Sequence, residues 1–121
     1  MAAVQRKIIL AVEDKQEIRL FLLLALKKTH HHAIFLVRGE HALRLLENIT
    51  PHLLILNFEL PDMMGLELYD RIHAVEGREP VPTIMLSLKS SLPDIGSRQI
   101  ILLKKLFDHE ELLLALNSML A

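Results

Sequence analysis

Five short blocks of consecutive aliphatic residues divide the chain, and between them apolar residues recur every three or four positions. An apolar block without polar alternation is typical of a strand buried on both faces, whereas the recurring pattern is typical of an amphipathic helix. We therefore predict strands over residues 7–12, 33–37, 53–56, 82–88 and 100–103, and helices over residues 16–28, 40–48, 66–75 and 109–120.

The order of these elements predicts a doubly wound α/β domain. Each strand is joined to the next by a segment long enough for a right-handed crossover, which indicates five βα units and a five-stranded parallel sheet in a three-layer sandwich. Residues 89–99 contain Pro93 and Gly96, so we expect the fourth helix to be short or irregular. Neither a repeat nor a linker divides the sequence, and residues 1–121 are expected to form a single domain.

Two helix starts carry capping signals. Asp14 and Glu17 have the spacing of a capping box before the first helix. Asp108 is placed to cap the last helix, with acidic residues in the first turn where the helix dipole favours them.

Composition excludes several classes of function. The chain has 121 residues, a net charge of −1 and no cysteine, which argues against nucleic-acid binding, disulfides and thiolate metal sites. No apolar run approaches a membrane span and the amino terminus does not resemble a signal peptide, so we expect a cytoplasmic protein without membrane contact. No motif typical of an enzyme appears, and His30–His32 are expected to lie in a hydrated turn rather than to bind a metal.

Polar residues end four of the predicted strands. Glu13 and Asp14 follow the first strand, Asn57 follows the central one, Ser87 ends the fourth and Lys105 comes after the fifth. Because the carboxyl ends of parallel strands meet at one edge of a sheet, these side chains are expected to converge there.

This set of residues, in this order, resembles the active site of response-regulator receiver domains, and the resemblance covers the whole chain. It implies a flavodoxin-like fold. It also implies a role for each residue: Mg²⁺ ligands at Glu13, Asp14 and the backbone carbonyl of Glu59, the phosphoacceptor position at Asn57, phosphate contacts at Ser87 and Lys105, and a switch position at Leu102.

Asn57 departs from the family, which places an aspartate at this position. A neutral amide is a poorer Mg²⁺ ligand than a carboxylate and cannot form a stable acyl phosphate. Leu102 also departs from the family, because it stands where an aromatic residue often switches between two positions. We interpret the chain as a degenerate receiver, or pseudo-receiver, in two-component or phosphorelay signalling, with weakened Mg²⁺ binding and no other cofactor.

The first and last helices carry more leucines than one buried face requires. In the receiver fold these helices are neighbours, so the resemblance implies a shared apolar surface that binds a protein. The expected partner is a second copy of the chain, a sensor histidine kinase or another signalling domain. The candidate surface residues are Leu20, Leu23, Leu24, Leu113 and Leu114.

Two alternatives remain at this point. The first is an ordinary phospho-accepting receiver in which Asn57 is an introduced substitution. The second is a flavodoxin-like binder of a small ligand, although the acids Glu13 and Asp14 would repel a phosphate-bearing ligand from the loop after the first strand.

Overall fold

The structure is a computed structural model that describes residues 6–75, 77–87, 94–104 and 107–120. The strands are β1 (Ile8–Val12), β2 (His32–Leu36), β3 (Leu53–Asn57), β4 (Thr83–Ser87) and β5 (Ile100–Lys104). The helices in these ranges are α1 (Gln16–Leu26), α2 (Gly39–Leu45), α3 (Gly65–His73) and α4 (His109–Leu120). The five predicted strands and the four helices predicted over residues 16–28, 40–48, 66–75 and 109–120 are present, with ends that differ by at most a few residues, whereas residues 89–93 of the expected short or irregular fourth helix lie outside the described residues.

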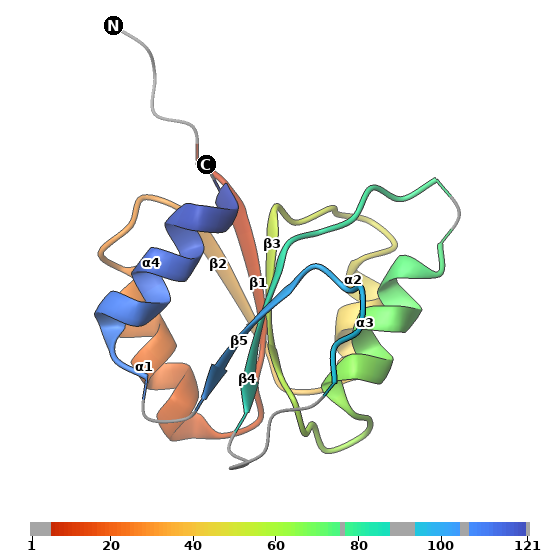
Figure 1. Cartoon of the computed structure of the whole chain (residues 1–121), viewed down its shortest axis with the longest axis horizontal. Helices are drawn as coiled ribbons and strands as arrows, with labels where there is room; N and C mark the ends of the chain where they lie inside the picture. Colours follow the sequence, from red (N-terminus) through yellow and green to blue (C-terminus); the bar gives the residue numbers. More distant parts are fainter. Residues whose placement is uncertain (1–5, 76, 88–93, 105–106, 121) are drawn as a thin grey trace, which may run out of the picture.

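The strands form one parallel sheet in the order β2-β1-β3-β4-β5. Helices α1 and α4 cover one face of the sheet and α2 and α3 cover the other (Figure 1). Along β3, Leu53 and Ile55 pack toward α1 and α4, while Leu54 and Leu56 pack toward α2 and α3. Both faces of the strand are therefore apolar, which explains the uninterrupted run of aliphatic residues and confirms the doubly wound sandwich.

One of the two predicted helix caps is wrong. The N-cap of α1 is Lys15, which makes no side-chain capping bond, and Asp14 instead accepts a hydrogen bond from Asn57 Nδ2 at 2.9 Å. A neighbouring strand end thus offers Asp14 a donor that competes with the helix. The other cap is confirmed, because Asp108 Oδ1 accepts the backbone N–H of Glu111 at 2.8 Å.

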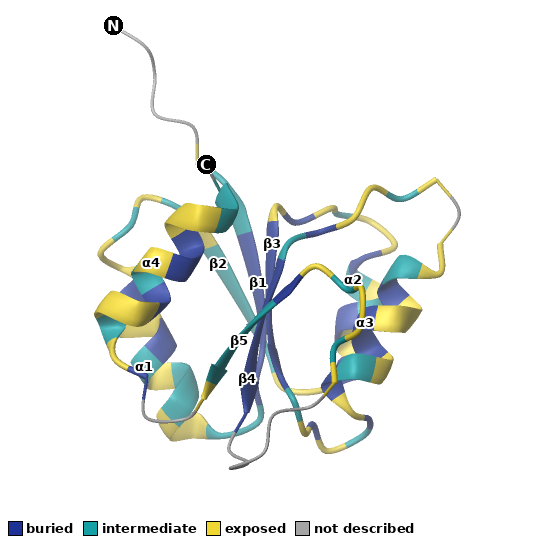
Figure 2. Ribbon diagram, viewed as in Figure 1, coloured by how far each residue is buried: buried dark blue, intermediate teal, exposed yellow. Residues whose placement is uncertain are grey.

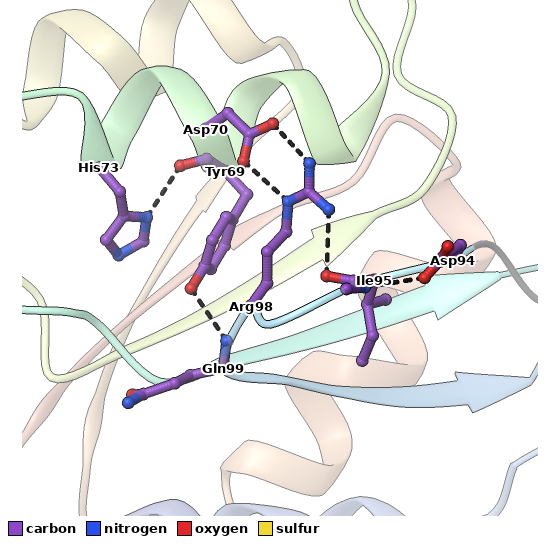
Figure 3. Close-up of polar contacts among 8 residues, drawn as sticks. Tyr69, Asp70, His73, Asp94, Ile95, Arg98 and Gln99 are labelled. Atoms are coloured by element: carbon purple, nitrogen blue, oxygen red, sulfur yellow. Dashed lines mark hydrogen bonds and ion pairs between the residues drawn. The ribbon is translucent and has the colours of Figure 1, made fainter.

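The described residues that precede β5, 94–99, form turns rather than a helix. They are attached to α3, where both oxygens of Asp70 accept hydrogen bonds from Arg98 at 2.7 and 2.8 Å (Figure 3). Arg98 also donates to the carbonyl of Ile95, and the hydroxyl of Tyr69 accepts the backbone N–H of Gln99 at 3.1 Å. These contacts hold residues 94–99 against α3.

Two imidazoles hold the amino end of β1. His31 Nδ1 accepts the backbone N–H of Lys7 at 3.1 Å, and His52 Nδ1 accepts that of Ile8 at 3.0 Å. A ring nitrogen can accept only while it is unprotonated. Burial, together with the positive charges of His30, Lys7 and His52, lowers the pKa of His31 below its usual value of 6.5.

The described residues contain no group of three metal-ligating side chains, and no helix among them is long and apolar enough to cross a membrane.

We expect His31 to make stability depend on pH. Because the pKa of His31 is lower in the folded chain, the unfolded chain binds a proton first as the pH falls below about 6.5, and the free energy of unfolding should decrease there. In His31→Asn, Oδ1 can still accept the Lys7 N–H but does not titrate. Urea unfolding at about pH 7.5 and about pH 5 should show a smaller pH effect for this variant than for wild type.

His32→Asn provides the matched control, since His32 is exposed and lies next in the chain. An equal pH effect in wild type and His31→Asn would contradict the role assigned to His31.

Candidate functional site

Parallel pairing brings the carboxyl ends of β1, β3 and β4 together. Val12 lies opposite Leu56 in the sheet, and Asn57 lies opposite Leu86, so the residues that follow β1 reach the end of β3. Three polar side chains at this edge are almost fully buried, since Glu13 is 2% exposed, Asn57 4% and Ser87 2%, whereas Asp14 is half-buried. The predicted convergence of these residues is confirmed, whereas Lys105 lies outside the described residues.

The side-chain amide of Asn57 joins the two acids. Its Nδ2 donates to Glu13 Oε2 at 2.8 Å and to Asp14 Oδ1 at 2.9 Å, while its Oδ1 accepts the backbone N–H of Glu59 at 3.2 Å. The reversed amide would place oxygen against two carboxyl groups and nitrogen against an N–H donor. The surrounding groups therefore determine the orientation of the amide, and both of its hydrogens are used.

The two acids have opposite pKa shifts. Burial raises the pKa of Glu13, and the neighbouring Asp14 raises it further, while the backbone N–H of Lys15 opposes both. Burial alone would also raise the pKa of Asp14, but hydrogen bonds from Glu13 and Asn57 outweigh it and the pKa is lowered. Asp14 is thus the more acidic member of the pair, and Glu13 retains its proton to a higher pH than an ordinary glutamate.

Backbone contacts hold the loop that carries these acids. Glu13 Oε2 accepts the N–H of Lys15 at 3.1 Å, and Arg19 Nη1 donates to the backbone carbonyls of Glu13 and Asp14 at 3.0 and 2.8 Å. Arg19 was not among the site residues predicted from the sequence. Its position could have indicated this role, because Arg19 is a cation near the start of a helix that directly follows Glu13 and Asp14.

The loop after β3 passes close to the site because of one glycine. Gly65 donates its N–H to the carbonyl of Phe58 at 2.7 Å, and a Cβ on Gly65 would lie 2.4 Å from the carbonyl oxygen of Asn57. Any side chain at this position would push the loop away from the end of β3. Gly65 therefore allows α3 to begin directly beside Asn57.

Little free volume remains around Asn57. A hollow of about 10 Å³ is lined by Glu13, Asn57 and Ser87 among others, and a second hollow of about 30 Å³ lies between Lys15, Asn57 and Glu59. Spaces of this size hold one or two water molecules. The described residues therefore leave only small hollows directly beside Asn57.

The groups at this edge do not fit Mg²⁺ as they are arranged. Mg²⁺ requires oxygen ligands in near-octahedral geometry. Asn57 presents two N–H donors to the acids, and its only side-chain oxygen faces Glu59 N–H. The amide hydrogens thus occupy the position between the carboxyl groups that a cation would need.

The other predicted site residues lie apart from Asn57 or on the surface. The Glu59 side chain is exposed, although its backbone, which was the predicted ligand, lies beside Asn57 and donates its N–H to Asn57 Oδ1. Leu102 is half-buried against the core beneath α2 and α3. On the opposite face, Leu113 is half-buried against the core and Leu114 is 63% exposed. Exposed residues follow the outward sides of α1 and α4 (Figure 2).

Comparison with known families identifies one that spans most of the chain. A sequence model described as "Response regulator receiver domain" matches residues 9–117. The chain is 31% identical over 88 residues to Histidine kinase P4 of Formosa agariphila, and 31% identical over 87 residues to the transcriptional regulatory protein AfsQ1 of Streptomyces coelicolor. These alignments cover 73% and 72% of the chain but only 6% and 37% of the relatives.

Solved structures share the fold. The signal receiver domain of an HD domain-containing protein from Pseudomonas fluorescens Pf-5 is 30% identical, with a TM-score of 0.83 over 96% of this chain and 95% of that one. The receiver domain of sensor histidine kinase PA1611 from Pseudomonas aeruginosa PAO1 superposes with a TM-score of 0.85 over 96% and 98% of the two chains. The identity in that case is 22%, so the second likeness concerns the fold alone.

We expect Asn57→Asp to destabilise the protein in the absence of divalent cations. The substitution replaces two buried donors with a third carboxyl group, which should cost about 2–4 kcal/mol near neutral pH. Mg²⁺ should restore much of this loss in Asn57→Asp and should leave wild type unchanged. Thermal unfolding with Mg²⁺ or with EDTA measures both effects.

Asn48→Asp is the matched control, because it makes the same chemical change at an exposed position. If Asn57→Asp were as stable as wild type in EDTA, the amide would not be what holds the acids together.

Proposed function

Since the chain belongs to the response regulator receiver domain family, we propose that it is a two-component signalling module that does not accept a phosphoryl group at Asn57 and acts by binding another protein. In this proposal Asn57 stands at the phosphoacceptor position, Ser87 and Lys105 at the phosphate-contacting positions and Leu102 at the switch position. It is a binding module rather than an enzyme.

The proposal depends on the hydrogen bonds of Asn57. Attack on phosphorus requires an anionic oxygen nucleophile, whereas the amide oxygen is neutral and its nitrogen lone pair is delocalised. Both amide hydrogens are also bound to Glu13 and Asp14. This arrangement satisfies the two acids without a cation and leaves no reactive oxygen for the transfer.

The surface of the chain supports a role in protein binding. Leu20, Leu23 and Leu24 on α1 and Leu114 on α4 are each between 38% and 63% exposed. Apolar side chains gathered on one side of a small domain are typical of an interaction site. The relatives include a histidine kinase and a transcriptional regulator, and signalling proteins of this kind are the class of partner that we propose.

The alternatives have less support. The PA1611 receiver domain is described with a magnesium ion in its active site cleft, whereas here the two acids are bonded to the Asn57 amide. A nucleotide or flavin would not fit the hollows of about 10 and 30 Å³ at this edge. An ordinary receiver with an introduced Asn57 makes a separate prediction, which the next experiment tests.

Incubation with acetyl phosphate and Mg²⁺, followed by intact-mass spectrometry, tests the proposal. We expect no phosphoryl adduct on wild type, because Asn57 has no nucleophilic oxygen. If the remainder of the site is competent, Asn57→Asp should gain one acid-stable, base-labile adduct, and Asn48→Asp should gain none.

An adduct on wild type that maps to the carboxyl edge of the sheet would overturn the proposal. Absence of an adduct on Asn57→Asp would instead remove the support for an ordinary receiver with a single introduced change.

A further inference from the structure

The outward side of α1 carries an apolar centre between two opposite charges. Leu20, Leu23 and Leu24 are 55%, 38% and 48% exposed. Glu17 lies one turn before them and Lys27 one turn after, and both are exposed. At about 100° per residue, Glu17, Leu20, Leu24 and Lys27 lie within about 80° of the helix circumference. We call these four residues the α1 stripe.

The α1 stripe is complementary to itself. Leu20 and Leu24 lie equally far from position 22, and so do Glu17 and Lys27. A two-fold axis that crosses the helix at position 22 therefore places Leu20 against Leu24 of a second copy, and Glu17 against its Lys27. We propose that the partner of this surface is a second copy of the chain, with the two α1 helices packed antiparallel.

This inference rests on the proposed function, because it identifies the partner of the same leucine-rich surface. It does not depend on whether Asn57 can be phosphorylated.

Charge specifies the antiparallel arrangement. A parallel pair would place Glu17 against Glu17 and Lys27 against Lys27, which is repulsive, whereas the antiparallel pair forms two equivalent Glu–Lys contacts. Within one chain these two residues are about 15 Å apart along the helix, too far to pair with each other. In the described part of the chain neither of them forms an ion pair, so both charges are available to a partner.

The surface beside the stripe provides space for a partner side chain. A hollow of about 350 Å³ is lined by Gln16, Arg19, Leu20, Leu23 and Phe35, between α1 and the outer strand β2. The Leu24 side chain of the second copy lies next to Leu20 in the antiparallel register and can enter this hollow. The two-fold axis repeats the contact, so both hollows are filled at once.

The first test is self-association of the full chain. Wild type should pass from monomer to dimer in sedimentation velocity over about 10 µM to 1 mM, the range of a small, weak interface. Leu24→Glu should remain monomeric throughout, because it buries two carboxylates at the two-fold axis. Val75→Glu is the matched control, because Val75 is 53% exposed and follows α3 on the other face of the sheet. This variant should dimerise as tightly as wild type.

The second test exchanges the charges. Glu17→Lys and Lys27→Glu should each weaken self-association by about tenfold, because each creates two like-charge contacts. When the two variants are mixed, every contact across the axis again joins a lysine and a glutamate. The mixture should therefore form heterodimers about as tightly as wild type forms homodimers, with each variant's circular dichroism confirming that α1 is intact.

Three results would overturn the inference: a wild-type monomer at every concentration, a Leu24→Glu variant that still dimerises, or a mixture no tighter than its components. The last result would mean that α1 binds a different partner, or pairs with a second copy in a different register. None of these results bears on the phosphoryl-transfer test, so failure of the dimer and failure of the proposed function are distinguishable.

Discussion

The carboxyl edge of this receiver domain depends on one neutral amide that satisfies a buried acid, Glu13, and a half-buried one, Asp14. Parallel strands bring Glu13, Asp14 and Asn57 within hydrogen-bond distance, and carboxyl groups buried this closely need a proton, a cation or donors between them. Asn57 supplies the donors, and its oxygen binds the loop that follows. The polar atoms of the Asn57 amide are consequently satisfied by the protein's own groups.

Helix α1 has two apolar sides with different purposes. Its inner side, with Leu22, Ala25 and Leu26, is fully buried against the sheet and accounts for the stability of the helix. The leucines on its outer side add nothing to that core, so they reduce solubility unless a partner covers them. A surface that stays available while both amide hydrogens of Asn57 are bonded to acids is the basis for proposing signalling by contact rather than by phosphoryl transfer.

Residues 94–99, the described part of the connection before β5, are held by α3 although they form turns rather than a helix. Side-chain and backbone hydrogen bonds from Arg98 and Gln99 to α3 replace the packing that a helix would provide. These contacts use polar groups on a helix that already packs against the sheet. The segment therefore remains attached while the order of the strands is preserved.

Much of this architecture was determined by the sequence alone. Uninterrupted aliphatic blocks require strands covered on both faces, and the polar residues that end them must then meet at one edge, as Asn57 and Glu13 do. Only the tertiary structure decided which donor Asp14 binds. The N–H groups at the start of α1 and the amide of Asn57 are both possible donors, and the short distance between the ends of β1 and β3 favours the amide. It also decided that Leu114 is exposed while Leu113 is half-buried. The rotation of α4 about its axis follows from its packing against α1 and the sheet. The sequence does not specify that rotation, because α4 carries leucines on several sides.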